Sequence, residues 1–298
     1  MAIVPGIQVI EERFGPAPAI GLPSAQAGVL GTATWGPPNV PLRVSSWPEW
    51  TRKFGGLDPN QQIGFDLYEA YNQGLRDILY VRITDSTEEK AAVTLQDRAT
   101  TPENTLEVEA RYPGSLGDRL SVQILDATYG ENAFRLRVLL DGRGVPGEDF
   151  DGLTIEDCES KINGQSAYII VTNMESVSTA PDNLPELGVS NLIGGSDGST
   201  PTDTDYVGGV DVDGTRKGLE ALVPFVDELG LVLAPGITTQ TVQAALLQFA
   251  ERYYFPYALL DGEGVGDQEV EEHRNALGQS SFGGYYYQRA FIQNPLTG

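Results

Sequence analysis

Two short apolar runs in the last third of the chain dominate its hydrophobic pattern. They span Leu229–Ala234 and Tyr257–Leu260, and a Pro-Gly or Asp-Gly pair closes each of them. Continuous apolar runs of this length are typical of strands buried on both faces of a sheet. Between them, Thr239–Tyr254 carries apolar residues at spacings of three and four, which predicts an amphipathic helix with Gln243 and Glu251 on its polar side. The pattern predicts a βαβ unit with parallel strands.

The same alternation of helices and strands continues on both sides of this unit. After it, a helix over Asp267–Leu277 and a strand over Tyr285–Ile292 are predicted. The first third of the chain predicts a strand, two helices and a strand, in that order, over Ala27–Thr34, Ser46–Phe54, Ile63–Asn72 and Ile78–Ile83. Ser46 and Glu49 have the spacing of a capping box, and Gly55 is placed to end the first helix. Together these elements predict an open α/β core.

The pattern changes in the middle of the chain, where no long helical period persists. Short apolar runs there predict strands over Ala91–Leu95, Thr105–Ala110, Leu120–Leu125, Phe134–Leu140 and Ala167–Val171. Dipeptides typical of tight turns stand at hairpin-like spacing, namely Pro113-Gly114, Asp141-Gly142 and Asp151-Gly152. We therefore predict a β-rich, barrel-like or sandwich-like domain over residues 90–191, inserted into an α/β core that is built from residues 24–89 and 192–298.

The first 23 residues form an arm ahead of this core. Ile7–Glu12 predicts a short strand, and Arg13–Pro23 after it is rich in Pro, Gly and Ala, which is typical of a linker. A strand that has no partner nearby in the sequence must pair with a sheet edge elsewhere. The arm is therefore predicted to be an extended strand with a distant partner.

Composition narrows the range of partners and compartments. The chain has 298 residues with 19 Lys and Arg against 42 Asp and Glu, so its net charge is −23. Nucleic acid and anionic membrane surfaces are therefore excluded as expected partners. Cys158 is the single cysteine and can form no internal disulfide, which fits assembly in a reducing compartment. With neither a signal-peptide pattern nor a long apolar run, the chain is expected to be neither exported by a signal peptide nor membrane-spanning.

One set of residues imitates a hydrolase triad. Gly194-Gly195-Ser196-Asp197-Gly198 matches the G-x-S-x-G pattern of a nucleophile elbow, and Asp261 and His273 follow Ser196 in the order of α/β-hydrolases. An elbow serine stands between a strand and a helix, whereas the residues after Gly198 are a poor helix start. A hydrolase with Ser196, Asp261 and His273 is therefore kept only as the alternative hypothesis, and we expect no enzyme activity.

Three other stretches imitate binding sites. Gly262–Asp267 resembles a dinucleotide fingerprint, but its carboxylates would repel a pyrophosphate, and we interpret Asp267 as a helix cap. Two acidic loops, Asp203–Asp205 and Asp211–Gly214, suggest calcium ligands but lack the Glu of an EF-hand. The run Tyr285–Tyr287 is interpreted as a strand and its interface. We therefore expect no cofactor and no metal.

An ordered series of short motifs resembles the contractile phage tail sheath family. The opening Pro5–Glu12 is similar to the Pro-Gly-Val-Tyr-Val-x-Glu start of that family. Further landmarks follow in the family's order, at Val29–Ala33 with Gly36-Pro37, Val44–Trp47, Phe54–Gly56, Tyr80–Ile83, Pro113–Leu120, Gly194–Gly198, Ala234–Gly236, Ala258–Asp261 and Asn294–Gly298. The chain departs from the family at its end, where family members run on into a C-terminal domain that faces the tail tube.

The resemblance implies a structural function. Sheath subunits form stacked hexameric rings around a tail tube, and the sheath contracts to drive the tube through the host envelope. It implies assembly in the host cytoplasm, a place in the virion tail, and as partners neighbouring sheath subunits, the tail tube protein, and baseplate and tail terminator proteins. A sheath-like or baseplate component of a phage-derived injection machine is the alternative. The residues that the resemblance assigns to a linker strand between subunits are Pro5, Gly6, Ile7, Gln8, Val9, Ile10, Glu11 and Glu12.

Overall fold

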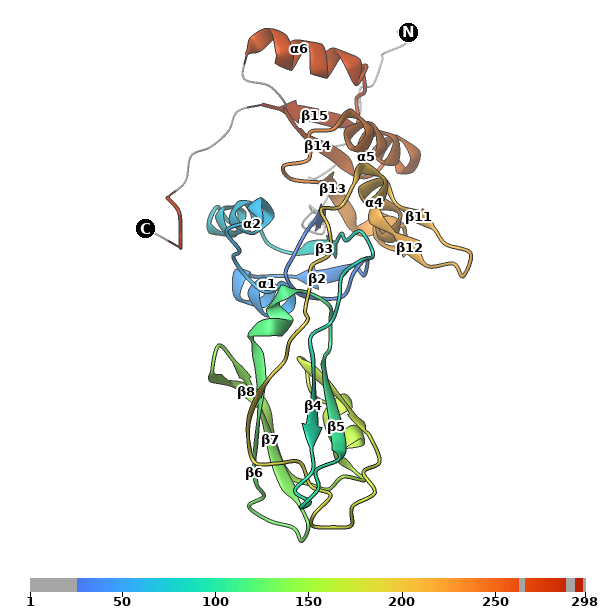
Figure 1. Cartoon of the computed structure of the whole chain (residues 1–298). Coiled ribbons are helices and arrows are strands. Elements are labelled where there is room, and N and C mark those ends of the chain that lie inside the picture. The colour runs from blue at the N-terminus through green and yellow to red at the C-terminus, as the bar shows by residue number, and fades with distance from the viewer. Residues whose placement is uncertain (1–25, 263–265, 288–292, 297–298) are drawn as a thin grey trace, which may run out of the picture.

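The computed structural model describes residues 26–262, 266–287 and 293–296, and these form an elongated molecule (Figure 1). An α/β core lies at one end and a β-rich part at the other, with extended segments of the chain between them. The first and last thirds of the described chain build the core, and the middle third builds the β-rich part. The predicted fold class, an α/β core with a β-rich insertion, is confirmed.

The core contains one six-stranded sheet in the order β15-β14-β13-β1-β3-β2. Its strands are β1 (Gln26–Gly31), β2 (Leu42–Val44), β3 (Ile78–Arg82), β13 (Leu229–Leu233), β14 (Tyr257–Asp261) and β15 (Gly283–Tyr286). All neighbours are parallel except β2, which is an antiparallel edge strand. Strands β13 and β14 are adjacent, parallel and joined by helix α5 (Gln240–Tyr253), so the predicted βαβ unit is confirmed.

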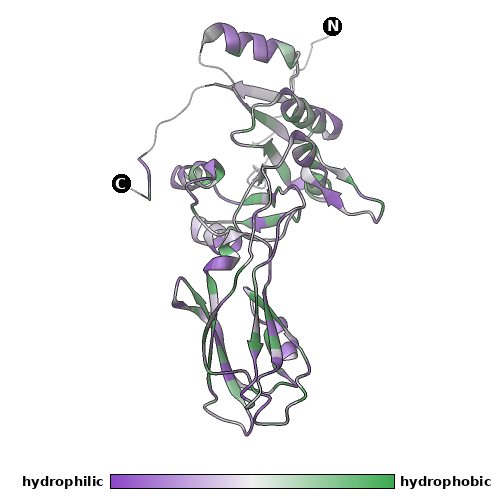
Figure 2. Ribbon diagram, in the orientation of Figure 1, coloured by the Kyte–Doolittle hydropathy of each residue, from purple (hydrophilic) through white to green (hydrophobic). Residues whose placement is uncertain are grey.

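Helices lie on both faces of this sheet. On one face, η2 (Gly218–Glu228), α5 and α4 (Asp203–Val207) share a hydrophobic cluster with the strands, and α6 (Asp267–Ala276) lies beside β15. On the other face, α1 (Trp47–Phe54) and α2 (Gln62–Asn72) pack on β1 and β3. A small hairpin, β11 (Gly209–Val210) and β12 (Arg216–Lys217), follows α4. Figure 2 shows α6 coloured mostly as hydrophilic, in contrast with the inner strands of the sheet.

The ends of α1 differ in one detail from the predicted capping box. Ser46 is the N-cap residue but its side chain makes no capping bond. Instead, Glu49 Oε2 accepts hydrogen bonds from the backbone N and the hydroxyl of Ser45, at 2.9 and 2.7 Å. The helix ends as predicted at Gly55, whose φ of 96° lies in the left-handed region that glycine tolerates.

Helix α5 contains an internal polar residue that the sequence analysis placed wrongly. Gln243 was expected on the polar side, but it is fully buried, whereas Glu251 is exposed as expected. Gln243 Nε2 donates to the backbone carbonyls of Ile237 (3.3 Å) and Asp261 (2.5 Å). The glutamine therefore ties the turn after β13 to the end of β14 through two partly buried carbonyl groups.

Strands β13 and β14 are less buried than their apolar runs suggested. Both were expected to be buried on both faces, but only Leu229 and Val232 of β13 and Ala258 and Leu260 of β14 are fully buried. In the described part of the chain, the helices on their second face pack on β1 and β3, with Leu231 and Leu233 of β13 at the border of that cluster. One face of β13 and β14 is therefore partly open.

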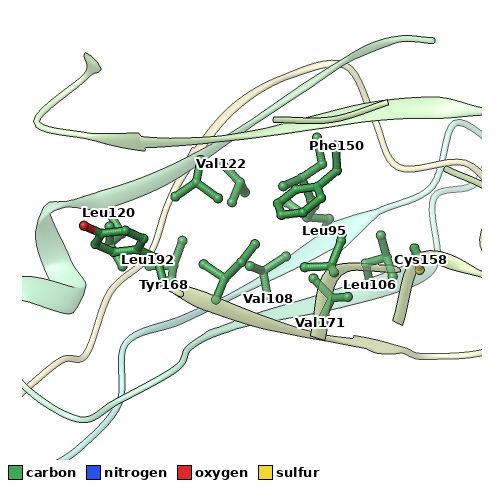
Figure 3. Close-up of a cluster of buried hydrophobic side chains, with 14 of the residues drawn as sticks. Leu95, Leu106, Val108, Leu120, Val122, Phe150, Cys158, Tyr168, Val171 and Leu192 are labelled. Carbon is green, nitrogen blue, oxygen red and sulfur yellow. The ribbon is translucent and has the colours of Figure 1, made fainter. Parts of the chain in front are cut away.

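The β-rich part is a sandwich of two open sheets. One sheet has the order β10-β6-β7-β8, with β6 (Leu120–Asp126), β7 (Phe134–Leu140), β8 (Arg143–Leu153) and β10 (Gly188–Asn191). The other has the order β4-β5-β9, with β4 (Ala92–Gln96), β5 (Asn104–Ala110) and β9 (Ile169–Asn173). Figure 3 shows side chains of both sheets in one shared core, such as Val122 and Phe150 from the first and Val108 and Val171 from the second.

Several features of the β-rich part departed from expectation. Strands β8 and β10, helix α3 (Cys158–Asn163) and the short helix η1 (Ser115–Arg119) were not predicted. The pair Asp141-Gly142 forms the expected hairpin turn, with φ of 50° and 73°. Asp151-Gly152 instead lies inside β8, and Pro113-Gly114 leads into η1. Helix α3 has six residues, too few to show a helical period.

Candidate assembly interface

The predicted linker strand itself, Pro5–Glu12, lies outside the described residues, so its role stays a prediction. The described structure does present two edges of the core sheet, β2 and β15. The β2 edge is only three residues long and carries Arg43, which pairs with Asp77 (3.3 Å) and Glu228 (2.5 Å). Short edges with charged side chains disfavour strand addition. Of these two edges, β15 is the better acceptor for another strand.

The β15 edge is apolar and aromatic. Tyr286 is 62% exposed and Tyr287 is 51% exposed, directly where the strand ends. Tyr285 points to the other face, where its hydroxyl lies 2.7 Å from Nδ1 of His273 in α6. Exposed aromatic side chains next to an open strand edge are typical of a surface that receives a partner.

The rival triad is not assembled. Asp197, next to Ser196, is bonded to Arg82 of β3, whereas His273 is bonded to Tyr285 of β15. Strands β3 and β15 are four positions apart in the sheet, which is about 19 Å at the usual strand spacing. Ser196 also lies in an extended segment that pairs with Glu89, not at a strand-to-helix turn.

Asp261, the third member of the rival triad, has its own partner. Its Oδ2 accepts a hydrogen bond from the backbone N of Gly236 at 2.6 Å. The serine, the aspartate and the histidine are therefore held in three different places by three different sets of bonds, and the triad order in the sequence does not correspond to an arrangement in space.

The two acidic loops use their carboxylates internally. Asp205 forms a capping box with Thr202 at the start of α4, and Asp203 accepts a bond from Thr239. Asp211 pairs with Lys217 at 2.9 Å, and Asp213 accepts a bond from the backbone of Thr215. Within residues 26–262, 266–287 and 293–296, no cluster of three or more potential metal ligands is present.

The dinucleotide-like stretch is only partly described, because residues 263–265 lie outside the described part. Helix α6 begins at Asp267 and its N-cap residue is Gly266, so the interpretation of Asp267 as the cap was wrong by one position. Among the helices of the described chain, none is long and apolar enough to span a membrane.

A buried arginine joins the α/β core to the β-rich part. Arg82, at the end of β3, has no exposed surface. Its Nη1 donates to the carbonyl oxygens of Gly36 (2.8 Å) and Pro113 (2.6 Å), and its Nη2 lies 3.3 Å from Asp197 Oδ1. Burial lowers the pKa of Arg82, and the carboxylates of Asp197 and Glu88 oppose that shift. Arg82 is therefore a buried cation that is bound by one partly exposed carboxylate and by two backbone carbonyl oxygens.

Asp197 extends this network to two more segments. It accepts hydrogen bonds from the backbone N (2.9 Å) and the hydroxyl (2.7 Å) of Ser115, at the start of η1. Gln61, just before α2, donates from its side-chain Nε2 to Asp197 Oδ2 at 3.4 Å. One carboxylate thus connects the returning chain, the β-rich part and the core.

Glycines allow the backbones to approach closely at this junction. Gly114 has a φ of 141°, and a Cβ atom there would overlap the carbonyl oxygen of Thr34. A Cβ atom on Gly195 would lie 2.5 Å from the carbonyl oxygen of Gly114. Leu116 also donates from its backbone N to Thr34 O at 3.2 Å. Substitution of either glycine would force these segments apart.

An aromatic residue of the core also enters the β-rich part. Trp35, shortly after β1, is 1% exposed and belongs to the hydrophobic cluster of the sandwich. It stacks on Tyr168 at 6.1 Å between ring centroids and meets Tyr112 edge-on at 5.5 Å. Sequence reasoning missed both Trp35 and Arg82 as junction residues.

Four of the quoted sequence landmarks meet at this junction. The buried cation, its acceptors and the close glycine contacts come from these four landmarks, namely Val29–Ala33 with Gly36-Pro37, Tyr80–Ile83, Pro113–Leu120 and Gly194–Gly198. They are far apart in sequence and adjacent in the fold.

Comparison with known proteins gives structural matches alone. No protein-family model and no curated protein sequence matches the chain. The solved structure of the sheath tail protein of Listeria innocua matches with a TM-score of 0.56 and 18% identity over 80% of this chain and 47% of that one. The sheath tail protein of Desulfitobacterium hafniense matches with a TM-score of 0.49 and 16% identity over 87% and 53%.

The chain therefore spans about half of the length of the sheath tail proteins that it matches. At this identity the Listeria match shows a shared fold. That shared fold includes most of the chain.

Proposed function

We propose that this chain is a structural subunit of a contractile tail sheath, which assembles with further copies of itself around a tail tube. The observation that carries the proposal is the fold shared with the Listeria sheath tail protein over 80% of the chain. The junction of landmarks around Arg82 and Asp197 supports it, because these landmarks are the motifs that resemble the sheath family. The acidic surface and the missing triad fit a structural role.

In this proposal, Ile7–Glu12 adds as a strand to the β15 edge of a neighbouring subunit, with stacked hexameric rings as the assembled form. Such a strand gains about five backbone hydrogen bonds at about 1 kcal/mol net each. Ordering six residues costs about 1–2 kcal/mol per residue in backbone entropy. The two terms are of similar size, so one arm does not drive assembly, whereas many arms acting together do.

Contraction then follows from rigid subunits that change their contacts. The polar junction and Trp35 hold the β-rich part against the core, so that each subunit slides and rotates as one body while the arms keep neighbours connected. The energy of contraction lies in the interfaces between subunits.

The test is assembly of the chain with the tail tube protein and baseplate, viewed by electron microscopy. Deletion of residues 1–14, or Val9→Pro, is expected to abolish polymerisation along the tube and to leave the circular dichroism spectrum unchanged. Ala17→Pro in the proline-rich linker is the matched control and should assemble normally. Sheaths of normal length without the arm would reject strand addition. Binding confined to the tube end would favour a baseplate component.

A further inference from the structure

Among the described residues, no helix packs over one half of one sheet face. The face with α1 and α2 carries, in one row across the strands, Ala27 of β1, Leu231 of β13 and Tyr257 of β14. The next row carries Val29, Leu233, Leu259 and Gly284. Helices α1 and α2 pack on the β1 and β3 half of this face, and α5 and α6 lie on the opposite face.

This region is mostly apolar, and we name it the open half-face. It consists of Leu231, Leu233, Tyr257, Leu259, Gly284 and Tyr286. Leu231 and Leu233 form its border with the α1 and α2 cluster, and Asp261 lies beside Tyr286 as its one acidic neighbour in the row. Tyr257 is 39% exposed and Tyr286 is 62% exposed, and the three leucines are only partly buried. Gly284 lies between the two tyrosines, because a Cβ atom there would meet Tyr257 and Tyr286 at 3.1 Å each. The absence of a side chain on Gly284 lets the two aromatic rings approach the strand closely.

Two more exposed aromatic residues stand just before β14 in the sequence. Tyr254 is 78% exposed and Phe255 is 56% exposed, and both come directly before β14. An exposed aromatic and aliphatic surface such as the open half-face is unusual on a protein and indicates a covering partner.

The segment just before β1 has the composition of such a cover. From Phe14 to Ala25 no residue is charged, in a chain whose charged residues make up 20% of the total. The segment contains Phe14, Ile20 and Leu22 among Pro, Gly and Ala. The arm that precedes it carries Glu11, Glu12 and Arg13, so the apolar character begins at Phe14 and continues to the start of the sheet.

The described chain begins at Gln26, next to the open half-face, so the segment that precedes Gln26 starts close to it. Gln26 is buried at the start of β1, one residue before the row of Ala27, Leu231 and Tyr257. Tyr257 is two strands away from Ala27, or about 10 Å, which about three extended residues span. Ile20 and Leu22 are therefore within reach of Tyr257 and Leu259, and Phe14 is within reach of β15.

We propose that residues 14–23 lie across the open half-face of their own chain, with Ile20 and Leu22 against Tyr257 and Leu259. The tether at Gln26 gives this segment an effective concentration in the millimolar range, which a second copy in dilute solution does not match. The opposite face is closed by η2, since a Cβ atom on Gly28 would lie 2.8 Å from the side chain of Leu222. In this arrangement the arm leaves the subunit beside β15, with residues 1–12 free to reach a neighbour.

The proposal is tested on the single subunit in dilute solution by hydroxyl-radical footprinting of tyrosine side chains. The variant Ile20→Ser with Leu22→Ser is expected to raise oxidation of Tyr257 and Tyr286 severalfold, because their cover is lost. Oxidation of Tyr129, 66% exposed in the β-rich part, is the internal reference and should not change. The matched control is Ala17→Ser with Ala19→Ser, which keeps the apolar side chains and should behave as the parent chain.

Two deletions give an independent result. Removal of residues 1–13 should leave both tyrosines protected, and removal of residues 1–23 should expose them. Equal oxidation in all variants would overturn the proposal, as would protection that appears only when the protein concentration is raised, since that indicates a second copy as the cover. The measurement uses no tube and no assembled sheath, so its failure is separate from failure of the proposed function.

Discussion

Arg82 and Asp197 are 115 positions apart in the sequence and form an ion pair, with 3.3 Å between Nη2 and Oδ1, where the β-rich part meets the core. The arginine is fully buried, whereas the aspartate side chain is 28% exposed. A buried charge is tolerated when it is paired and hydrogen-bonded. The pair therefore ties the end of β3 to the chain that returns from the β-rich part, with the carbonyls of Gly36 and Pro113 as further acceptors.

Asp197→Ala is the first test of this junction. It leaves the Arg82 charge buried without its carboxylate, and it should lower the free energy of unfolding by about 3 kcal/mol. Asp141→Ala breaks the exposed pair with Arg119 and should cost less than about 1 kcal/mol. Urea denaturation measures both. The double variant Arg82→Met with Asp197→Ala should lose less than the sum of its single changes, and strict additivity would show that the two residues are not coupled.

Trp35→Ala tests whether a core residue completes the sandwich. Removing a buried tryptophan typically costs about 3–5 kcal/mol. Because Trp35 stacks on Tyr168, we expect the loss to appear in the unfolding of the β-rich part, followed by hydrogen exchange in β5 and β9. Trp47→Ala is the control, since Trp47 is only partly buried and packs against the cluster of α1 and α2 in the α/β core, not in the sandwich. Equal exchange in the two variants would contradict the placement.

The excised segment 90–191 is predicted to unfold cooperatively, because its two sheets share one core. It lacks Trp35, so its thermal midpoint should be lower than that of the same region in the whole chain. Thermal unfolding followed by circular dichroism measures this. A segment without dispersed amide resonances by NMR would show that the division of the chain at 90 and 191 is wrong.

Local hydrophobic patterns were sufficient to predict most elements of the α/β core. Each strand or helix there shows its own run or periodicity of apolar residues, without reference to distant segments. Strand β1 is buried at every position, and α2 ends where its apolar spacing ends. The β-rich part was harder, because β8 carries Pro146 and several glycines and has no continuous apolar run. Its pairing with β7 comes from the hairpin at Asp141-Gly142 and from burial of its last residues.

The junction could not be predicted from single segments. Arg82 ends an apolar strand, and nothing near it in sequence identifies a partner 115 positions later. The motif around Ser196 was compared with a nucleophile elbow, whereas its important side chain is Asp197. The Asp197 carboxylate accepts four hydrogen bonds from Arg82, Ser115 and Gln61, and these depend on the topology, which brings their segments together.

Gln243 was predicted to be exposed because it is polar, although its position in the helical period indicates burial. Leu246 and Ala250 follow it at three and seven positions, so the helical period places Gln243 on the buried side of α5. Gln243→Leu keeps the volume but removes the donor to Ile237 O and Asp261 O. We expect a loss of about 1–3 kcal/mol in the free energy of unfolding, since two partly buried carbonyls lose their donor.

The matched control for this substitution is Glu251→Leu on the exposed side of the same helix, which should change stability by less than about 0.5 kcal/mol. Chemical denaturation of both variants gives the comparison. If Gln243→Leu were as stable as the parent chain, the tie between the turn after β13 and the end of β14 would contribute nothing.

The last prediction concerns the pH dependence of the free energy of unfolding. The hydrogen bond from Lys53, at 2.8 Å, together with the bonds from Ser45 lowers the pKa of Glu49 from 4.5 to about 2. A carboxyl whose pKa is lower in the folded state contributes stability above its unfolded value and loses it as the pH falls through the folded value. Glu49 should therefore stabilise α1 fully above pH 4.5, and this contribution should disappear between pH 4.5 and about 2.

Glu49→Gln is expected to flatten the fall in unfolding free energy across this range, and to lower stability at pH 7, where the parent glutamate is charged. Denaturation at a series of pH values measures both effects. Glu251→Gln, on the exposed face of α5, should keep the parent's pH dependence. Parallel curves for Glu49→Gln and the parent between pH 4.5 and 2 would show that the bonds from Ser45 and Lys53 do not hold Glu49 ionised in the folded protein.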